Sequence, residues 1–552
     1  MNTKKPGNPG QTHLDRRGFL KLGIAGGTAA IAAPPFGQSA EAAPAEQGIR
    51  PFELNETTIA ALQRDMNSGK LTARSITEKY LEQIEELDHR GPALHSYIEV
   101  NPEALAIAER LDRERKAKGP RGPLHGIPVL VKDNIGTADR MTTTAGSYAL
   151  AGSIPPRDSF VAHQLRKAGA IILGKANLSE WANFRSSHST SGWSGRGGQT
   201  RNPYALDRNP CGSSSGSAVA TSANLCCAAL GTETDGSIVC PSSTNGIVGI
   251  KPTVGLLSRS GVVPISHSQD TAGPMARTVA DAATLLGALA GVDPRDRATL
   301  GSRGKSHTDY TKFLDAAGLR GTRIGVVRHF FGFNEFVDKL MDAAIAAMKG
   351  QEATIVDPVE IETVAELDKP EFEVLLYEFK ADLNAYLASL GPEAPVHSLK
   401  QIIEFNEQHT REEMPYFGQD LFLKAEAKGP LSSPEYQAAR AKCRTLSRAK
   451  GIDATMNKFK LDALVAPTGS PGWTTDLING DHDTGGSSTP AAVAGYPSIT
   501  VPAGYAFGLP VGISFFGRAY SEPTLIKLAY AFEQATRLRE PPKFLATADL
   551  WV

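Results

Sequence analysis

Short apolar, β-branched runs alternate with alanine-rich stretches between about residues 124 and 300, and this alternation restricts the chain to few folds. Runs this short are typical of strands buried on both faces, and the stretches between them are typical of covering helices. The runs in this region are GIPVLVKD (126–133), AIILGKAN (170–177) and GIVGIKP (246–252), and similar ones follow at 320–328, 461–468, 498–504 and 510–517. We therefore predict an α/β fold with a mixed β-sheet core flanked by helices.

The rest of the chain favours one large domain. Residues 55–88 have the pattern of two amphipathic helices, and residues 336–455 are charged and rich in helical patterns. A closing helix is expected over 521–538. The sequence shows neither an internal repeat nor a Gly/Ser linker long enough to separate domains. We predict a single domain over residues 43–552, with a helix-rich insertion at about 336–455.

The first 42 residues have the pattern of an export signal. Arg16 and Arg17 precede a short apolar stretch rich in Ala and Gly, and an A-x-A site ends at Ala42. This order is typical of a secretory signal, and the paired arginines resemble the bacterial twin-arginine type. The apolar stretch is too short for a transmembrane helix. We expect loss of residues 1–42, a periplasmic or secreted bacterial protein, and no membrane anchor afterwards.

Charge and cysteine content argue against several kinds of partner. Lys and Arg total 58 against 59 Asp and Glu, which gives a formal net charge of −1. This balance implies no broad basic surface for nucleic acid. The five cysteines form no CxxC pair and no Cys/His cluster, so no zinc site is predicted. Whether Cys211 and Cys240 form a disulfide stays open, and a monomer is the expected state.

The stretch CGSSSGSAVA, residues 211–220, holds four serines and two glycines without a histidine or carboxylate. A flexible linker is disfavoured because an alanine-rich pattern, interpreted as helix over 217–236, follows at once. A phosphate loop would need GxxxxGK[ST] or GxGxxG spacing. Residues 212–216 match G-x-S-x-G with Ser214 as nucleophile, but no strand precedes them, as that motif requires. That interpretation also requires a histidine, for which the candidates are His267, His307, His329, His397, His409 and His482.

Two further segments favour another interpretation of the serine-rich stretch. Lys132 ends the apolar run GIPVLVKD, and Ser237 lies in the turn TETDGS. Taken alone, a lysine in this place is most simply ion-paired or extended toward solvent, and Ser237 is an ordinary turn serine. In this order and at these spacings, however, the three segments resemble the amidase signature family. The resemblance extends over roughly residues 50 to 540.

The resemblance implies an amide hydrolase with the amidase signature fold and no cofactor or metal. It assigns Lys132 as general base, Ser213 as a bridging serine that follows a cis peptide bond, and Ser237 as nucleophile. The oxyanion hole is expected from the backbone N–H groups of Thr234, Asp235, Gly236 and Ser237. Lysine serves as a base only when neutral, and burial lowers a lysine pKa by up to about 3 to 5 units. The apolar run before Lys132 is consistent with such burial.

The expected substrate is a small peptide amide. Several segments outside the three motifs are similar to family members that release ammonia from C-terminally amidated peptides. A broader amino-acid amidase, an aryl acylamidase and an ammonia-supplying amidotransferase subunit are alternatives within the family. A secreted binding protein that has lost activity is an alternative outside it, although such a protein would be expected to lack one of Lys132, Ser213 and Ser237.

Overall fold

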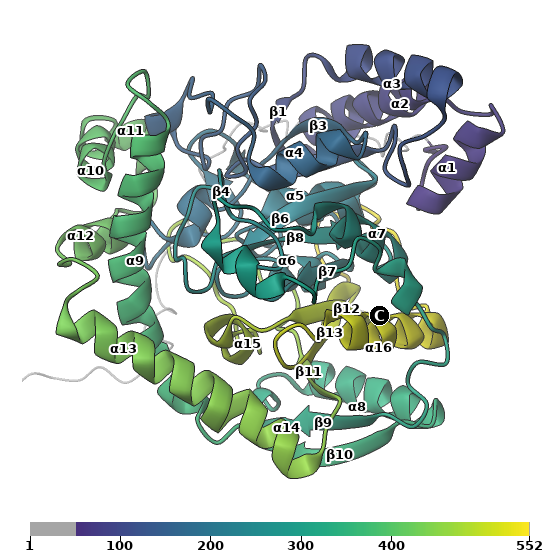
Figure 1. Cartoon of the computed structure of the whole chain (residues 1–552), viewed down its shortest axis with the longest axis vertical. Coiled ribbons are helices and arrows are strands. Elements are labelled where there is room, and N and C mark those ends of the chain that lie inside the picture. The colour runs from purple at the N-terminus through teal and green to yellow at the C-terminus, as the bar shows by residue number, and fades with distance from the viewer. Residues whose placement is uncertain (1–50, 551–552) are drawn as a thin grey trace, which may run out of the picture. The chain divides into compact units, whose positions relative to one another are not determined.

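An eleven-stranded sheet runs through residues 51–550, the part of the chain that the computed structural model describes (Figure 1). The expected signal, residues 1–42, lies outside the described residues. The strand order is β1-β3-β2-β6-β8-β7-β12-β13-β11-β9-β10, and a separate two-stranded sheet pairs β4 with β5. The strands are β1 Tyr97–Val100, β2 Pro128–Lys132, β3 Ile171–Ala176, β4 Trp193–Ser194, β5 Gly198–Gln199, β6 Ala228–Glu233, β7 Val248–Lys251, β8 Thr271–Ala276, β9 Arg323–Val327, β10 Thr354–Val359, β11 Ala463–Pro467, β12 Ser498–Ala506 and β13 Leu509–Phe516.

The large sheet is mixed, and the predicted fold class is confirmed. Strand β2 pairs parallel with β3 and β6, and β9 pairs parallel with β10 and β11, whereas the remaining neighbours are antiparallel. Every residue of β2, β3 and β6 is buried. Strands covered on both faces need apolar residues at successive positions, which is why β2 and β3 appear in the sequence as continuous runs.

Helices pack near both edges of the sheet. The α-helices are α1 Ile59–Asn67, α2 Ala73–Ile84, α3 Ala104–Lys118, α4 Phe160–Lys167, α5 Ser215–Ser222, α6 Val239–Thr244, α7 Val279–Leu289, α8 Glu335–Gly350, α9 Asp368–Ser389, α10 Leu399–Gln408, α11 Thr410–Glu413, α12 Asp420–Glu426, α13 Pro434–Arg444, α14 Asp453–Phe459, α15 Thr489–Ala494 and α16 Glu522–Thr536. Helices α1 and α2 fall within the two helices expected over 55–88, and α16 is the expected closing helix. Within residues 51–550, no helix is both long and apolar enough to cross a membrane.

The helix expected over residues 217–236 is wrong in its second half. Helix α5 ends at Ser222, and β6 then takes its place in the sheet between β2 and β8. The β6 sequence, AALGTE, has no β-branched residue before its threonine. Its strand geometry comes from hydrogen bonding to neighbours on both sides, which outweighs the weak local preference of alanine for a strand.

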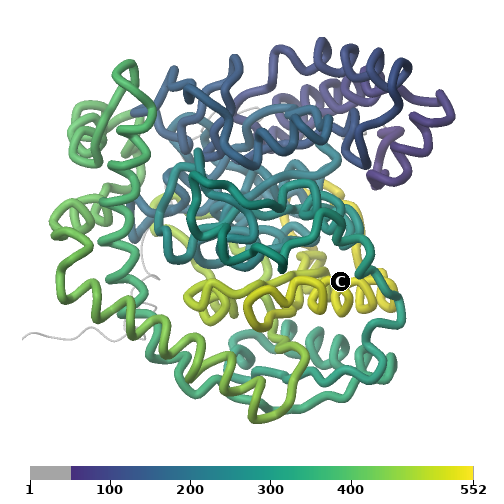
Figure 2. Tube along the Cα trace, viewed as in Figure 1, coloured from purple at the N-terminus to yellow at the C-terminus, as the bar shows by residue number. Residues whose placement is uncertain are grey.

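The expected insertion at about 336–455 contains part of the sheet as well as helices. Strand β10 lies within this range and pairs with β9, and α8 precedes it. Helices α9 to α13 follow and run along one side of the sheet, as the green segment shows in Figures 1 and 2. They have a core of their own, in which Phe379 and Phe422 stack at 5.4 Å and pack with Trp181 and Phe184. This core fixes the helices to the loop that follows β3.

Candidate active site

The expected catalytic segments meet at the carboxyl ends of two parallel strands. Lys132 is the last residue of β2, and the turn 234–237 follows β6, which pairs parallel with β2. The serine-rich stretch leads into α5, and the turn leads into α6. Because the carboxyl ends of neighbouring parallel strands lie at the same edge of a sheet, both loops come to lie beside Lys132.

Lys132 is a buried amine surrounded by oxygen atoms. Its Nζ lies 2.8 Å from Ser213 Oγ, 3.0 Å from Ser214 Oγ, 3.0 Å from Thr232 Oγ1 and 3.3 Å from the Thr232 carbonyl oxygen. The side chain is fully buried. Burial outweighs the opposite effect of two nearby carboxylates and lowers the pKa of Lys132 to about 7. Lys132 therefore loses its proton near neutral pH, as a general base must.

The loop that carries Ser213 is held at both sides. The Gly212–Ser213 peptide bond is cis. A Cβ atom on Gly212 would lie 2.2 Å from Ser179 Oγ, so this position accepts only glycine without rearrangement. Cys211 forms a disulfide with Cys240, with a Cα–Cα distance of 6.0 Å, which answers the question left open by the sequence. Since Cys240 belongs to α6, the disulfide ties the serine-rich loop to the helix that follows the turn 234–237.

The turn 234–237 is shaped by a carboxylate and a glycine. Glu233 Oε2 accepts hydrogen bonds from the backbone N–H groups of Ile238 at 2.7 Å and Val239 at 3.0 Å. These bonds anchor the first residues of α6 to the end of β6. Gly236 has a φ of 78°, a conformation that side chains with a Cβ rarely adopt. The backbone can therefore reverse tightly within the turn.

The turn presents a row of unpaired backbone donors. Within residues 51–550, the N–H groups of residues 234–237 donate to no acceptor. Ser237 is 8% exposed, and its carbonyl oxygen accepts the Ser214 N–H at 3.2 Å, so the turn and the serine-rich loop touch. Buried backbone donors are rarely left unpaired in folded proteins. Successive free N–H groups beside a serine are what an oxyanion hole requires.

Direct side-chain contact joins only part of the predicted triad. Lys132 and Ser213 share a hydrogen bond, whereas Ser237 approaches through its backbone contact to Ser214. Within the described residues, no hydrogen bond joins Ser237 Oγ to Ser213 Oγ. Catalytic hydrogen bonds are often long in unliganded enzymes and tighten when substrate binds. The arrangement is thus compatible with the predicted order of residues.

Sequence reasoning missed two groups that touch Lys132. Ser214 was considered as a nucleophile paired with histidine, but its Oγ donates to the Thr232 carbonyl at 3.0 Å and meets Lys132 instead. No histidine contacts Ser214 in the part of the chain that the structure describes. Thr232 Oγ1 accepts from Asn134 Nδ2 at 2.9 Å and also lies beside Lys132. Thr232 lies in β6, a strand that the sequence did not reveal, so the direction of its side chain could not be predicted.

A cavity of about 360 Å³ opens next to these residues. Asn134, Thr232 and Thr234, which adjoin Lys132 or belong to the turn 234–237, are among the residues that line it. Apolar side chains, among them Val263 and Ile265, also line it. Its volume lies within the range of about 300 to 1,000 Å³ that is usual for small-molecule sites.

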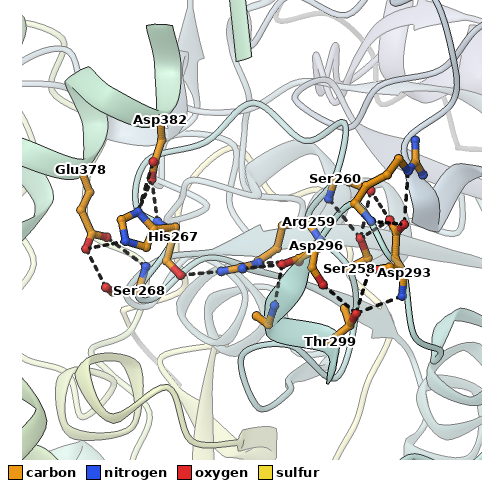
Figure 3. A network of polar contacts seen from close by, with 12 residues as sticks. Ser258, Arg259, Ser260, His267, Ser268, Asp293, Asp296, Thr299, Glu378 and Asp382 are labelled. Atoms are coloured by element: carbon orange, nitrogen blue, oxygen red, sulfur yellow. Dashed lines mark hydrogen bonds and ion pairs between the residues drawn. The ribbon is translucent and has the colours of Figure 1, made fainter. Parts of the chain in front are cut away.

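Several of the lining residues belong to the polar network shown in Figure 3. His267 lies between two carboxylates of α9, with Nδ1 2.9 Å from Asp382 Oδ2 and Nε2 3.2 Å from Glu378 Oε1. Burial opposes a charge on the ring, but the two carboxylates outweigh it and raise the pKa of His267. These three groups are close enough to hold a metal ion. They are satisfied as ion pairs with one another, and Arg259 likewise pairs with Asp296.

Comparison with known proteins gives the family. The sequence matches the family model described as Amidase over residues 75–526. The chain belongs to the amidase family. A structure of native peptide amidase from Stenotrophomonas maltophilia has a TM-score of 0.85 and 51% sequence identity, and covers 90% of this chain and 100% of its own. This amidase is accordingly an amide hydrolase with the amidase signature fold, as predicted.

Curated relatives of this amidase come from a plant and a yeast. A probable amidase of Arabidopsis thaliana is 46% identical over 504 residues, which cover 90% of this chain and 93% of the relative. A putative amidase of Schizosaccharomyces pombe is 39% identical over 525 residues, which cover 89% and 87%. These eukaryotic relatives point away from a bacterial protein exported by a twin-arginine signal. The predicted periplasmic or secreted location is therefore wrong. It rested on the arginine pair and the apolar stretch, which form a short pattern of low specificity. Both lie outside the described residues.

Proposed function

We propose that this amidase releases ammonia from C-terminally amidated peptides, with Ser237 as nucleophile, Ser213 as proton relay and Lys132 as general base. The observation that carries this proposal is the 2.8 Å contact between Ser213 Oγ and the buried amine of Lys132. A serine hydroxyl needs a base to become nucleophilic. The pKa of about 7 gives Lys132 a large neutral fraction at physiological pH.

The hydrogen bonds around Lys132 are consistent with a neutral amine that accepts from Ser213. Ser214 gives its own proton to the Thr232 carbonyl, so Ser214 Oγ can only accept from Nζ. The Thr232 carbonyl also accepts from Nζ. A neutral amine has two N–H groups and one lone pair. With one N–H group directed to Ser214 Oγ and the other shared by the two oxygen atoms of Thr232, Oγ1 at 3.0 Å and the carbonyl at 3.3 Å, the lone pair is left for the Ser213 hydroxyl.

The reaction then proceeds through an acyl-enzyme. Ser237 Oγ attacks the amide carbon and passes its proton to Ser213 Oγ, while the Ser213 proton moves to Lys132 Nζ. The oxyanion that forms is bound by N–H groups of residues 234–237, and one such donor commonly contributes about 10²- to 10³-fold in rate. The relay returns a proton to the leaving nitrogen, so ammonia departs. Water attacks the ester through the same relay, and the peptide acid leaves.

Two observations support a peptide amide as the substrate. The cavity is lined by Thr232 and Thr234, directly beside the proposed catalytic groups, and its mixture of apolar and polar walls suits a short peptide. The similarity to peptide amidase from Stenotrophomonas maltophilia extends over nine-tenths of this chain at 51% identity. The peptide therefore occupies the cavity, with the terminal amide at the turn 234–237.

Ammonia release by the purified full chain tests this proposal. An N-blocked dipeptide amide, a free amino-acid amide, an anilide and glutamine are compared, with Ser237→Ala as the control for contaminating activity. Preference for the dipeptide amide is the expected result. Preference for one of the other three compounds would assign a simpler amidase, an aryl acylamidase or a glutaminase-type activity to the same residues. Absence of turnover with all four would contradict a catalytic role.

A further inference from the structure

Helix α9 is connected to the turn 234–237 through the segment that precedes β8. Glu378 of α9 is fully buried and accepts hydrogen bonds from Ser268 N–H at 2.9 Å and from Ser268 Oγ at 2.6 Å (Figure 3). It also accepts from Ser266 Oγ. Tyr436 of α13 donates to the same carboxylate at 2.6 Å. With these donors, Glu378 fixes residues 266–268 against the helices.

The next two residues of this segment hold Thr234. Gln269 Nε2 donates to the Thr234 carbonyl at 3.3 Å, and Asp270 Oδ1 accepts from Thr234 Oγ1 at 2.6 Å. Gln269 Nε2 also donates to Glu371 Oε1 at 2.7 Å. Gln269 therefore bridges a carboxyl group of α9 and the first residue of the proposed oxyanion hole.

Glu371 also reaches the second residue of that turn. The carboxyl groups of Glu371 and Asp235 lie within hydrogen-bonding reach of each other. Asp235 Oδ2 accepts from Thr489 Oγ1 at 2.7 Å, and the Ser488 side chain also faces this carboxylate, but Asp235 Oδ1 is buried and has no donor within hydrogen-bonding distance among residues 51–550. Two ionised carboxylates cannot hydrogen-bond to each other, because both only accept. A proton on one of them supplies the missing donor.

We propose that Glu371 and Asp235 share one proton, and that Glu371 is thereby a positioning residue that holds the turn 234–237 against α9. The inference rests on the proposed function, since it assigns a task at the same site. Each carboxyl group has partners in this arrangement: Glu371 accepts from Gln269 and meets Asp235 through the shared proton, and Asp235 faces the hydroxyl groups of Thr489 and Ser488. The pair carries one negative charge. A second charge beside N–H groups that must stabilise an oxyanion would oppose the reaction.

The surroundings favour retention of the shared proton. Burial is the main cause that raises the pKa of both Glu371 and Asp235. The neighbouring Asp235 raises the pKa of Glu371 further, so Glu371 is the group that holds the proton more firmly. The other ionisable groups that face the pair are of both signs. Lys251 of β7 favours ionisation of Asp235, whereas Asp368 disfavours ionisation of Glu371, and the charges of Glu233 and the Cys443 thiol interact with the pair as well. The proton is therefore lost only as the pH rises.

Substitution of Glu371 by glutamine and by alanine tests the assignment. Glu371→Gln keeps an acceptor for Gln269 and supplies an N–H donor for Asp235, so kcat at neutral pH should stay close to that of the wild type. Glu371→Ala leaves the Asp235 carboxylate without its donor, and loss of positioning should lower kcat by about 10- to 100-fold with a smaller change in KM. In the wild type, kcat should fall on the alkaline side as the shared proton leaves, and Glu371→Gln should lack this fall. The matched control is Glu373→Gln on the same helix, whose carboxylate pairs with Lys428 away from the turn.

Infrared difference spectra give a readout that does not depend on activity. At neutral pH, the wild type minus Glu371→Gln should contain the C=O band of one protonated carboxyl group, whereas the wild type minus Glu373→Gln should contain bands of an ionised carboxylate. An ionised carboxylate in the first difference would overturn the shared proton. Equal losses of kcat in Glu371→Gln and Glu371→Ala would overturn the positioning role. If the protein hydrolyses no amide, the proposed function fails, and the infrared result still decides the state of the pair.

Discussion

Lys132 is the residue whose charge state governs the proposed reaction. Burial lowers its pKa to about 7, and only the neutral amine accepts a proton. We expect kcat/KM of the wild type to rise about tenfold per pH unit on the acid side and to level off near pH 7, before any alkaline fall, because the fraction of neutral Lys132 follows this course. Initial rates with a peptide amide across this pH range measure the effect.

Two variants of Lys132 separate its basicity from its charge. Lys132→Ala removes the base, and Lys132→Arg keeps a positive side chain that stays protonated in proteins. Both should lose the rise in kcat/KM with pH and most of the rate at neutral pH. A variant that keeps the pH profile of the wild type would remove Lys132 from the mechanism.

The two candidate serines give opposite predictions. Ser237→Ala should reduce turnover to background because it removes the nucleophile. Ser214→Ala removes one hydrogen-bond partner of Lys132, and loss of about 1 to 2 kcal/mol should lower kcat by roughly 5- to 30-fold. Trapping of the acyl group, followed by mass spectrometry of the peptides, should locate it on Ser237. Acylation of Ser214 would instead support the nucleophile elbow.

Sequence analysis identified the proposed triad but not its environment. Lys132, Ser213 and Ser237 are recognisable because each lies in a motif with characteristic neighbours. Thr232 and Asn134 have no such motif, and their place beside Lys132 depends on the pairing of β2 with β6. Contacts made across a sheet between distant segments are set by strand order and register, which no local pattern encodes.

At the scale of elements, the disulfide between Cys211 and Cys240 joins the loop before α5 to α6. Its two cysteines are 29 residues apart, and a crosslink over such a loop stabilises by about 3 kcal/mol in the chain-entropy description. Cys211→Ser combined with Cys240→Ser should therefore lower the Tm. It should also lower kcat, because the disulfide no longer links the loop of Ser213 to the helix that follows the turn 234–237.

Cys443→Ser is the matched control for the disulfide, since Cys443 is buried but forms no disulfide. Differential scanning calorimetry compares the three proteins, and ammonia release measures kcat. The double variant should lose more stability than the control. A Tm of the double variant equal to that of the wild type would contradict the stabilising role.

Strands were predictable where their residues are β-branched and less so elsewhere. The runs over 126–133, 170–177 and 246–252 contain β2, β3 and β7. Strands β6 and β8, with the sequences AALGTE and TAGPMA, were missed because alanine, glycine and proline have little preference for strands. They are strands because they lie in the interior of the sheet, between partners on both sides.

At the scale of the whole molecule, segments from the beginning, middle and end of the described chain meet around two carboxylates. Asp281 of α7 accepts the Ile59 N–H at the start of α1 at 3.1 Å. Glu533 of α16 accepts the Val279 N–H at the start of α7 at 2.7 Å. The order of the strands brings these helices together, so no pattern within one segment could predict the contact. Folding of the domain therefore buries Asp281 and half-buries Glu533 at once.

This enclosure predicts how stability depends on pH. Burial is the main cause that raises the pKa of Glu533 to about 7 and that of Asp281 to about 6. A carboxyl group whose pKa is higher in the folded than in the unfolded protein stabilises fully below its unfolded pKa, and this contribution is lost as pH rises through the folded pKa. The free energy of unfolding should therefore decrease between about pH 4 and about pH 7 through these two groups.

Glu533→Gln isolates the contribution of Glu533 to the pH dependence of the free energy of unfolding. Glutamine keeps an acceptor for the Val279 N–H but has no proton to lose, so its free energy of unfolding should decrease less over the same pH range. The difference from the wild type should be on the order of 2 kcal/mol, since one pKa unit corresponds to about 1.4 kcal/mol. Urea unfolding at several pH values measures it, with Glu540→Gln as the control because Glu540 is exposed. If the free energy of unfolding depends on pH in the same way in the wild type and in Glu533→Gln, Glu533 is ionised in the folded protein. The contact between α7 and α16 would then have to hold a charge that is partly shielded from solvent.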